Sequence, residues 1–270
     1  MTLILTAITP EHIVQVSDMK LTLPTGEVAD DHAAKMVLWC GRTLVAYTGL
    51  ACIHATRTDV WLAEVLAQAV SFENGVRRIR QRLTATLAGD RHLEVMLAGW
   101  VKTEPDGDCK PVVAEVSNVR DWDWSHPPRR YFESTTRLVP SHAVGHLGQP
   151  LLAEVECVLA DRLAASGDHP AVMANAMVEA VRSLAEVNRR VGRALLVGSV
   201  PRAAVPVDAT VSLGYVDWSR GMFLHVPERS DDPIVYGPDV VCHGAVMAGV
   251  RVMAGDGESL PPFILNYPCS

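Results

Sequence analysis

The sequence predicts an α+β fold: a four-layer αββα sandwich in which two antiparallel sheets pack face to face and a pair of helices covers each outer face. Three observations predict it. Strand and helix patterns follow in the order strands, two helices, strands, two helices, strands, which differs from the alternating order of a parallel α/β sheet. The helical segments carry single apolar stripes. Hydrophobic residues make up 49% of the 270 residues and charged residues 20%, enough for a sizeable core.

The first fifty residues have strand patterns. Leu, Ile and Thr dominate residues 2–8, and polar and apolar residues alternate in 12–16 and 43–48. Turn-forming residues separate these segments at 9–10, 24–26 and 40–41.

Two helix pairs are predicted from apolar spacing at i, i+3, i+4 and i+7. Ser71 and Asn74 supply capping chemistry at the start of the second helix. The stripes are Leu62, Val65, Leu66 and Ala69; Val76, Ile79 and Leu83; Leu151, Val155 and Val158; and Met173, Met177, Val181 and Leu184.

Further strand patterns lie between and after the helix pairs, at 92–101, 111–119, 130–138, 193–199, 210–217 and 221–226. We therefore expect one domain over residues 1–226. Residues 227–270, which are rich in loop signals, are expected to form a C-terminal extension packed on the same domain.

Composition excludes several function classes. The formal net charge of −7 argues against binding to nucleic acid. No apolar run approaches the ~20 residues that span a bilayer, and the N-terminus has no cationic leader. The six cysteines form no C-x-x-C pair, and His142 and His146 lack the context of a metal site, so no metal or cofactor is expected. We expect a cytoplasmic protein with reduced thiols.

Four residues near the start of the chain are candidates for a catalytic site because of their type, order and spacing. Thr2 follows the initiator Met, Asp18 lies within VQVSDMKLT, Lys35 ends ADDHAAK, and Gly49 lies within AYTGLA. Over residues 2–51 the chain thus resembles the proteasome β-type subunits and their bacterial relatives, which are N-terminal nucleophile hydrolases. Asp18 stands at the family's spacing of sixteen from Thr2, and the other two positions fit if one residue is inserted in the turn near Pro24.

The resemblance implies a role for each residue. Removal of Met1 would free the α-amino group of Thr2, whose pKa of about 7.7–8.0 suits a base for its own hydroxyl. Lys35 would stabilise the developing alkoxide, Asp18 would hold the lysine, and the N–H of Gly49 would bind the oxyanion, a contribution of about 3 kcal/mol. Each residue also has a plain structural alternative: a surface ion pair for Asp18 and Lys35, and a turn for Gly49.

Three positions depart from the family pattern. The family supports the amine with a serine before the third helix and with an aspartate and a serine after the fourth. Loose matching places His146, Asn188 and Val191 there. His146 is either a replacement proton carrier or a polar loop histidine.

The function implied by the resemblance is a threonine peptidase, acting within a homo-oligomeric ring on peptides or unfolded proteins delivered by an ATP-dependent unfoldase. Two alternatives share the fold: a non-peptidase amidase or acyl transferase using the same nucleophile, and a catalytically inactive scaffold subunit, which the three departures favour.

Overall fold

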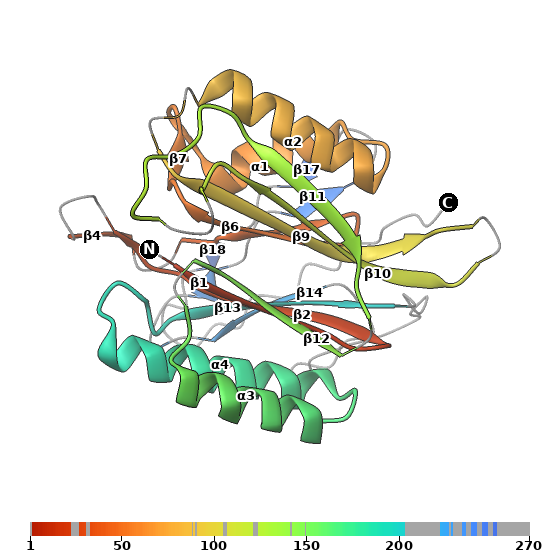
Figure 1. Ribbon diagram of the computed structural model, residues 1–270, viewed down its shortest axis with the longest axis vertical. Helices are drawn as coiled ribbons and strands as arrows, with labels where there is room; N and C mark the ends of the chain where they lie inside the picture. Colours follow the sequence, from red (N-terminus) through yellow and green to blue (C-terminus); the bar gives the residue numbers. More distant parts are fainter. Residues whose placement is uncertain are drawn as a thin grey trace.

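The computed structural model describes residues 2–22, 27–30, 33–87, 89, 91–104, 107–120, 124–140, 142–148, 150–202, 222–226, 228, 234–235, 239–241, 245–247 and 251–252. Within them, two large sheets lie face to face between two helix pairs (Figure 1). The predicted four-layer αββα sandwich is confirmed. One sheet is covered by α1 (Thr58–Ala67) and α2 (Phe72–Thr86), and the other by α3 (Ala153–Ala165) and α4 (Pro170–Val187).

The first sheet contains the beginning of the described chain and is antiparallel throughout. β1 and β2 form a hairpin in which Ile4 lies opposite Ser17. The strand order is β12-β1-β2-β13-β14. The bounds are β1 Leu3–Ile8, β2 His12–Asp18, β12 Ala143–Gly148, β13 Leu195–Pro201 and β14 Met222–Val226.

The second sheet has the order β11-β10-β9-β6-β5-β16-β17. Its pairs are antiparallel except that β16 runs parallel to β5, so a strand from the region after residue 226 extends the sheet. The bounds are β5 Met36–Trp39, β6 Thr43–Gly49, β9 Leu93–Lys102, β10 Cys109–Ser117, β11 Glu133–Leu138, β16 Asp239–Val241 and β17 Ala245–Met247.

Apolar side chains from both sheets fill the space between them, as alternation along each strand requires. Ile4 and Leu196 from the first sheet meet Leu44 and Met96 from the second. The opposite faces bind the helices. Leu5 and Val16 lie under Met173, Met177 and Val181, the stripe predicted for α4.

The N-terminus of α2 matches its sequence signal, since the hydroxyl of Ser71 accepts the N–H of Asn74 at 3.1 Å. In the middle of this helix, Gly75 lies against the ring of Trp39. A Cβ at this glycine would come within 2.5 Å of Trp39 Cη2, so α2 approaches β5 more closely than a larger residue would allow.

Several short strands complete the described structure, and the strands differ in places from those predicted. β5 and β12 were not predicted from pattern, and the strand predicted at 210–217 lies outside the described residues. The short strands are β3 Leu21–Thr22, β4 Val28–Asp30, β7 Cys52–Ile53, β8 Thr56–Arg57, β15 Ile234–Val235 and β18 Arg251–Val252.

The cysteines are not all reduced in the structure. Cys40 is disulfide-bonded, whereas Cys52, Cys109 and Cys157 are free. The prediction of uniformly reduced thiols is therefore wrong at Cys40. Among the helices that the structure describes, none is long and apolar enough to cross a membrane.

Candidate active site

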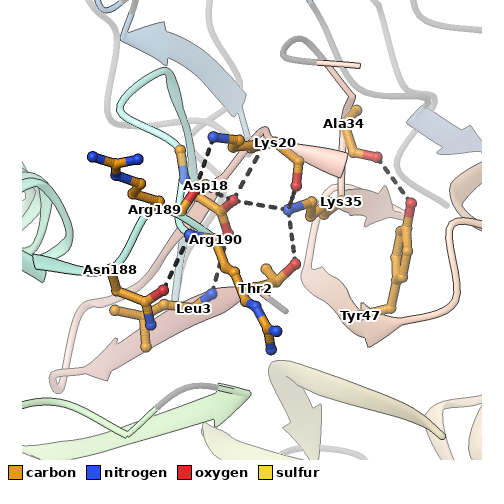
Figure 2. A network of polar contacts seen from close by, with 11 residues as sticks. Thr2, Leu3, Asp18, Lys20, Ala34, Lys35, Tyr47, Asn188, Arg189 and Arg190 are labelled. Carbon is orange, nitrogen blue, oxygen red and sulfur yellow. Dashed lines mark hydrogen bonds and ion pairs between the residues drawn. The ribbon is translucent and has the colours of Figure 1, made fainter. Parts of the chain in front are cut away.

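Thr2 lies immediately before β1, at one end of the sandwich, and its side chain is buried (Figure 2). The β1–β2 hairpin explains why Asp18 stands sixteen residues away. Because Ile4 lies opposite Ser17, the chain before β1 meets the end of β2. The backbone N–H of Leu3 donates to Asp18 Oδ1 at 3.1 Å, which joins the two ends of the hairpin.

Asp18 is fully buried and receives hydrogen bonds from several directions. Besides the bond from Leu3, its Oδ2 accepts the backbone N–H of Lys20 at 3.2 Å and that of Gly192 at 3.1 Å. Gly192 must be a glycine for this approach, because a Cβ there would come within 2.7 Å of Lys20 Cβ. The carboxylate is therefore held by backbone from three segments of the chain.

Lys35 brings its ammonium group to the same point (Figure 2). Its Nζ donates to Asp18 Oδ2 at 2.9 Å, to the carbonyl of Lys20 at 2.5 Å and to Thr2 Oγ1 at 2.7 Å. The segment before β5 is positioned by the first sheet, since the N–H of Ala33 donates to the carbonyl of Met19. Thr2, Asp18 and Lys35 thus form one connected group.

Burial governs the electrostatics of this group. Lys35 is 1% exposed, and loss of hydration lowers the pKa of its ammonium, while attraction to Asp18 and the hydrogen bond between them raise it in part. The net direction is downward. The Lys35 ammonium therefore donates a hydrogen bond to the Thr2 hydroxyl from a buried position, where it can stabilise negative charge on that oxygen.

Gly49 is the last residue of β6. Its φ is +110°, and a Cβ would lie 2.3 Å from the carbonyl oxygen of His92, so only glycine fits. The N–H of Tyr47 donates to the carbonyl of Lys35 at 3.1 Å. Because alternate N–H groups of a strand point the same way, the N–H of Gly49 points toward the edge of β6 where Lys35 lies.

Comparison with known proteins identifies the fold of this chain but assigns it to no sequence family. No protein-family model and no curated protein matches the sequence. Among solved structures, the chain is similar to an Anbu mutant from Hyphomicrobium sp. strain MC1, with a TM-score of 0.53 and 15% sequence identity over 86% of this chain and 89% of that chain. Anbu is a bacterial protein of proteasome-like, N-terminal nucleophile hydrolase fold. This chain has a proteasome-like fold.

His146, which was matched to the family's serine before the third helix, does lie before α3. It is exposed on β12, an outer strand of the described sheet, opposite Leu5, whose side chain faces the helices. Paired residues point to the same face, so His146 faces away from the space between the sheets. The residue of β12 that approaches Thr2 is Gly148, where a Cβ would come within 1.9 Å of the Thr2 carbonyl oxygen.

The other two auxiliary positions lie in the turn after α4. Asn188 is the C-cap residue just after α4, and its Oδ1 accepts the N–H of Arg190 at 3.1 Å (Figure 2). Val191 is buried in the apolar layer under the helices. The turn reaches the site through its backbone, because Gly192 binds Asp18 and the carbonyl of Arg189 accepts Lys20 Nζ at 2.9 Å.

Sequence reasoning missed the backbone partners of this site. The carbonyl of Lys20 and the N–H of Gly192 carry no side-chain signature, although Gly192 itself was available as a signal for close backbone approach. In the part of the chain that the structure describes, no group of three or more His, Cys, Asp or Glu side chains is placed to hold a metal ion.

Proposed function

We propose that this chain is a threonine-type N-terminal nucleophile hydrolase that cleaves peptide bonds, with Thr2 as nucleophile after removal of Met1. The observation that carries the proposal is the 2.7 Å contact between Lys35 Nζ and Thr2 Oγ1 within a buried group anchored by Asp18. A surface ion pair would not place an ammonium on a hydroxyl in a dry site, so the geometry favours the catalytic interpretation.

The reaction divides amide hydrolysis into two steps. Thr2 Oγ1 attacks the scissile carbonyl carbon while the α-amino group takes its proton and Lys35 stabilises the alkoxide. The N–H of Gly49 binds the oxyanion, worth about 3 kcal/mol. The amine then passes the proton to the leaving nitrogen, and the C–N bond breaks to leave an ester on Thr2. Water, deprotonated by the same amine, releases the acid and restores the enzyme.

The substrate and assembly belong to the same proposal. A peptide or unfolded protein, handled within a homo-oligomeric ring in the cytoplasm and delivered by an ATP-dependent unfoldase, fits the proteasome-like fold. The fold supports the proposed substrate and assembly, whereas the contacts among Thr2, Asp18 and Lys35 support the proposed chemistry.

A test needs a denatured protein substrate and two matched variants. Thr2→Ser keeps a hydroxyl and is expected to retain cleavage, whereas Thr2→Ala is expected to abolish it. A ladder of peptide products from wild type and Thr2→Ser, and none from Thr2→Ala, supports a peptidase. Turnover confined to small amides assigns the nucleophile to an amidase, and equal products from Thr2→Ala contradict the mechanism.

A second candidate, a catalytically inactive scaffold subunit, is favoured by one observation. Val191, at the position matched to an auxiliary serine, is an apolar core residue and offers no hydroxyl to the Thr2 amine. This candidate predicts that no electrophile labels Thr2 in the folded, assembled protein.

A further inference from the structure

The backbone that follows Gly49 is tied to the start of helix α1. β6 ends at Gly49, and α1 begins at Thr58. The N–H of Thr58 donates to the carbonyl of Ala51 at 3.0 Å, and its hydroxyl donates to the carbonyl of Leu50 at 2.8 Å. One residue of the helix therefore holds two successive carbonyl groups just beyond Gly49.

The hydroxyl of Thr58 serves this link and does not cap its own helix. The N-cap residue of α1 is Arg57, which makes no side-chain capping bond. A threonine at a helix start is usually an N-cap whose oxygen accepts an N–H of that helix. The hydroxyl of Thr58 instead donates to Leu50, which lies outside α1, and the residue is 0% exposed. The bond is therefore shielded from competing water.

The first turn of α1 is itself anchored. Asp59 is 1% exposed and accepts two hydrogen bonds from Arg57, one from Nε at 3.1 Å and one from Nη2 at 2.7 Å. A bidentate pair of this kind fixes orientation as well as position. Further along the helix, Leu62 and Leu66 are fully buried in the core. Thr58 therefore extends from a well-packed element.

Gly49 needs such an external restraint. Its φ is +110°, and a glycine has more backbone freedom than any other residue, so it does not fix this conformation by itself. Gly49 is also exposed. Pairing with Leu93 on β9 holds it from the strand side. On the other side, where β6 has ended, the bonds from Thr58 to the carbonyls of Leu50 and Ala51 hold the chain.

We propose that Thr58 is a positioning residue that keeps the N–H of Gly49 aimed at the oxyanion, which rests on the proposed function, in which that N–H binds the oxyanion formed when Thr2 attacks. An oxyanion donor is effective when it is held in advance at the place where the charge develops. Because the oxyanion forms after the substrate has bound, loss of the Thr58 hydroxyl is expected to slow the chemical step and leave binding unchanged.

The experiment measures covalent labelling of Thr2 by a peptide epoxyketone over a range of concentrations. Thr58→Val keeps the shape but lacks the hydroxyl. Its limiting rate is expected to fall by about tenfold or more, with the half-saturating concentration unchanged. Thr58→Ser regains the hydroxyl and is expected to stay within about threefold of wild type. Thr58→Ala lacks it too, and because alanine is a better helix former it replaces the valine variant if that one does not fold.

Thr9→Val is the matched control for a general loss of stability. Thr9 is buried, and its hydroxyl donates to the carbonyl of His12 at 3.2 Å and accepts the N–H of His12 at 3.0 Å. It lies beyond the other end of β1 from Thr2, about 20 Å away by the length of that strand. This variant is expected to be less stable in urea but to label Thr2 at the wild-type rate.

Hydrogen exchange of the backbone amides at residues 49–52 tests the restraint without the chemistry of Thr2. Loss of one hydrogen bond is expected to speed this exchange about tenfold in Thr58→Val and to leave it unchanged in Thr9→Val. If Thr2 is labelled in no protein, the proposed function fails, and exchange alone decides whether Thr58 holds the segment. Unchanged exchange, a wild-type limiting rate in Thr58→Val, or equally slow labelling in Thr58→Ser would overturn the proposal.

Discussion

At the level of single residues, the proposed chemistry depends on Lys35, whose buried ammonium lies against the hydroxyl of Thr2. We expect Lys35→Ala to slow electrophile labelling of Thr2 by about a hundredfold or more, because the alkoxide loses the cation beside it. The fold is expected to remain, since Asp18 keeps its backbone donors from Leu3, Lys20 and Gly192. Mass spectrometry of the labelled protein measures the rate, with circular dichroism as the control for folding. Unchanged labelling in folded Lys35→Ala would remove Lys35 from the mechanism.

Asp18→Asn tests the same pair through stability. The variant leaves a buried ammonium without its counter-charge, which is expected to lower the free energy of unfolding by about 3 kcal/mol. Arg137→Gln is the matched control, because it breaks an ion pair in which Arg137 is largely exposed. Its loss is expected to be below about 1 kcal/mol. Urea unfolding measures the free energy of unfolding of both variants. Similar decreases would show that the buried pair of Asp18 and Lys35 contributes no more to stability than the exposed pair.

Sequence alone predicted part of this site. The order and spacing of Thr2, Asp18 and Lys35 sufficed because a hairpin converts a separation along the chain into a contact in space. The carbonyl of Lys20 and the N–H of Gly192 were not predicted, since backbone donors and acceptors are common to all residues. Of the two alternatives for His146, the exposed position on β12 fits the polar histidine, and only the pairing of β12 with β1 shows which face it lies on.

At the scale of elements, helix α2 depends on a glycine in its middle. In most helices Gly→Ala gains about 1 kcal/mol. Here the new Cβ of Gly75→Ala would come within 2.5 Å of the ring of Trp39, which lies between α2 and β5. We therefore expect a net loss of about 1–2 kcal/mol in thermal or urea unfolding. Arg77→Ala, at an exposed position of the same helix, is expected to change stability by less than about 0.5 kcal/mol. A stabilised Gly75→Ala would contradict the close packing.

The long elements were predictable and the short ones were not. Helices α2 and α4 carry apolar stripes over several turns, and β6, β9 and β10 have clear strand patterns. β5 has four consecutive buried residues, so it lacks alternation. β12 contains two glycines and an exposed histidine, because it lies at an edge of its sheet and pairs on one side within the described structure.

At the scale of the whole molecule, helix α3 has spare apolar surface. Leu159 is its buried residue, while Val158 is 52% exposed and Leu152, just before the helix, 43%. Because such a surface favours a protein neighbour, we expect the purified protein to be a multimer by light scattering. Val158→Glu is expected to weaken the assembly. A mass near one chain throughout a hundredfold dilution series would contradict the ring and favour the small-amide enzyme.

Whether Thr2 becomes the N-terminal nucleophile can be decided from intact mass and covalent labelling together. Protein purified untagged from its native host is analysed by intact mass before and after treatment with a peptide epoxyketone, whose two electrophilic carbons react with a hydroxyl and an adjacent amine. We expect a mass lacking Met1 and one adduct mapped to Thr2. A mass that retains Met1, or a processed protein that takes up no adduct at Thr2, would contradict it.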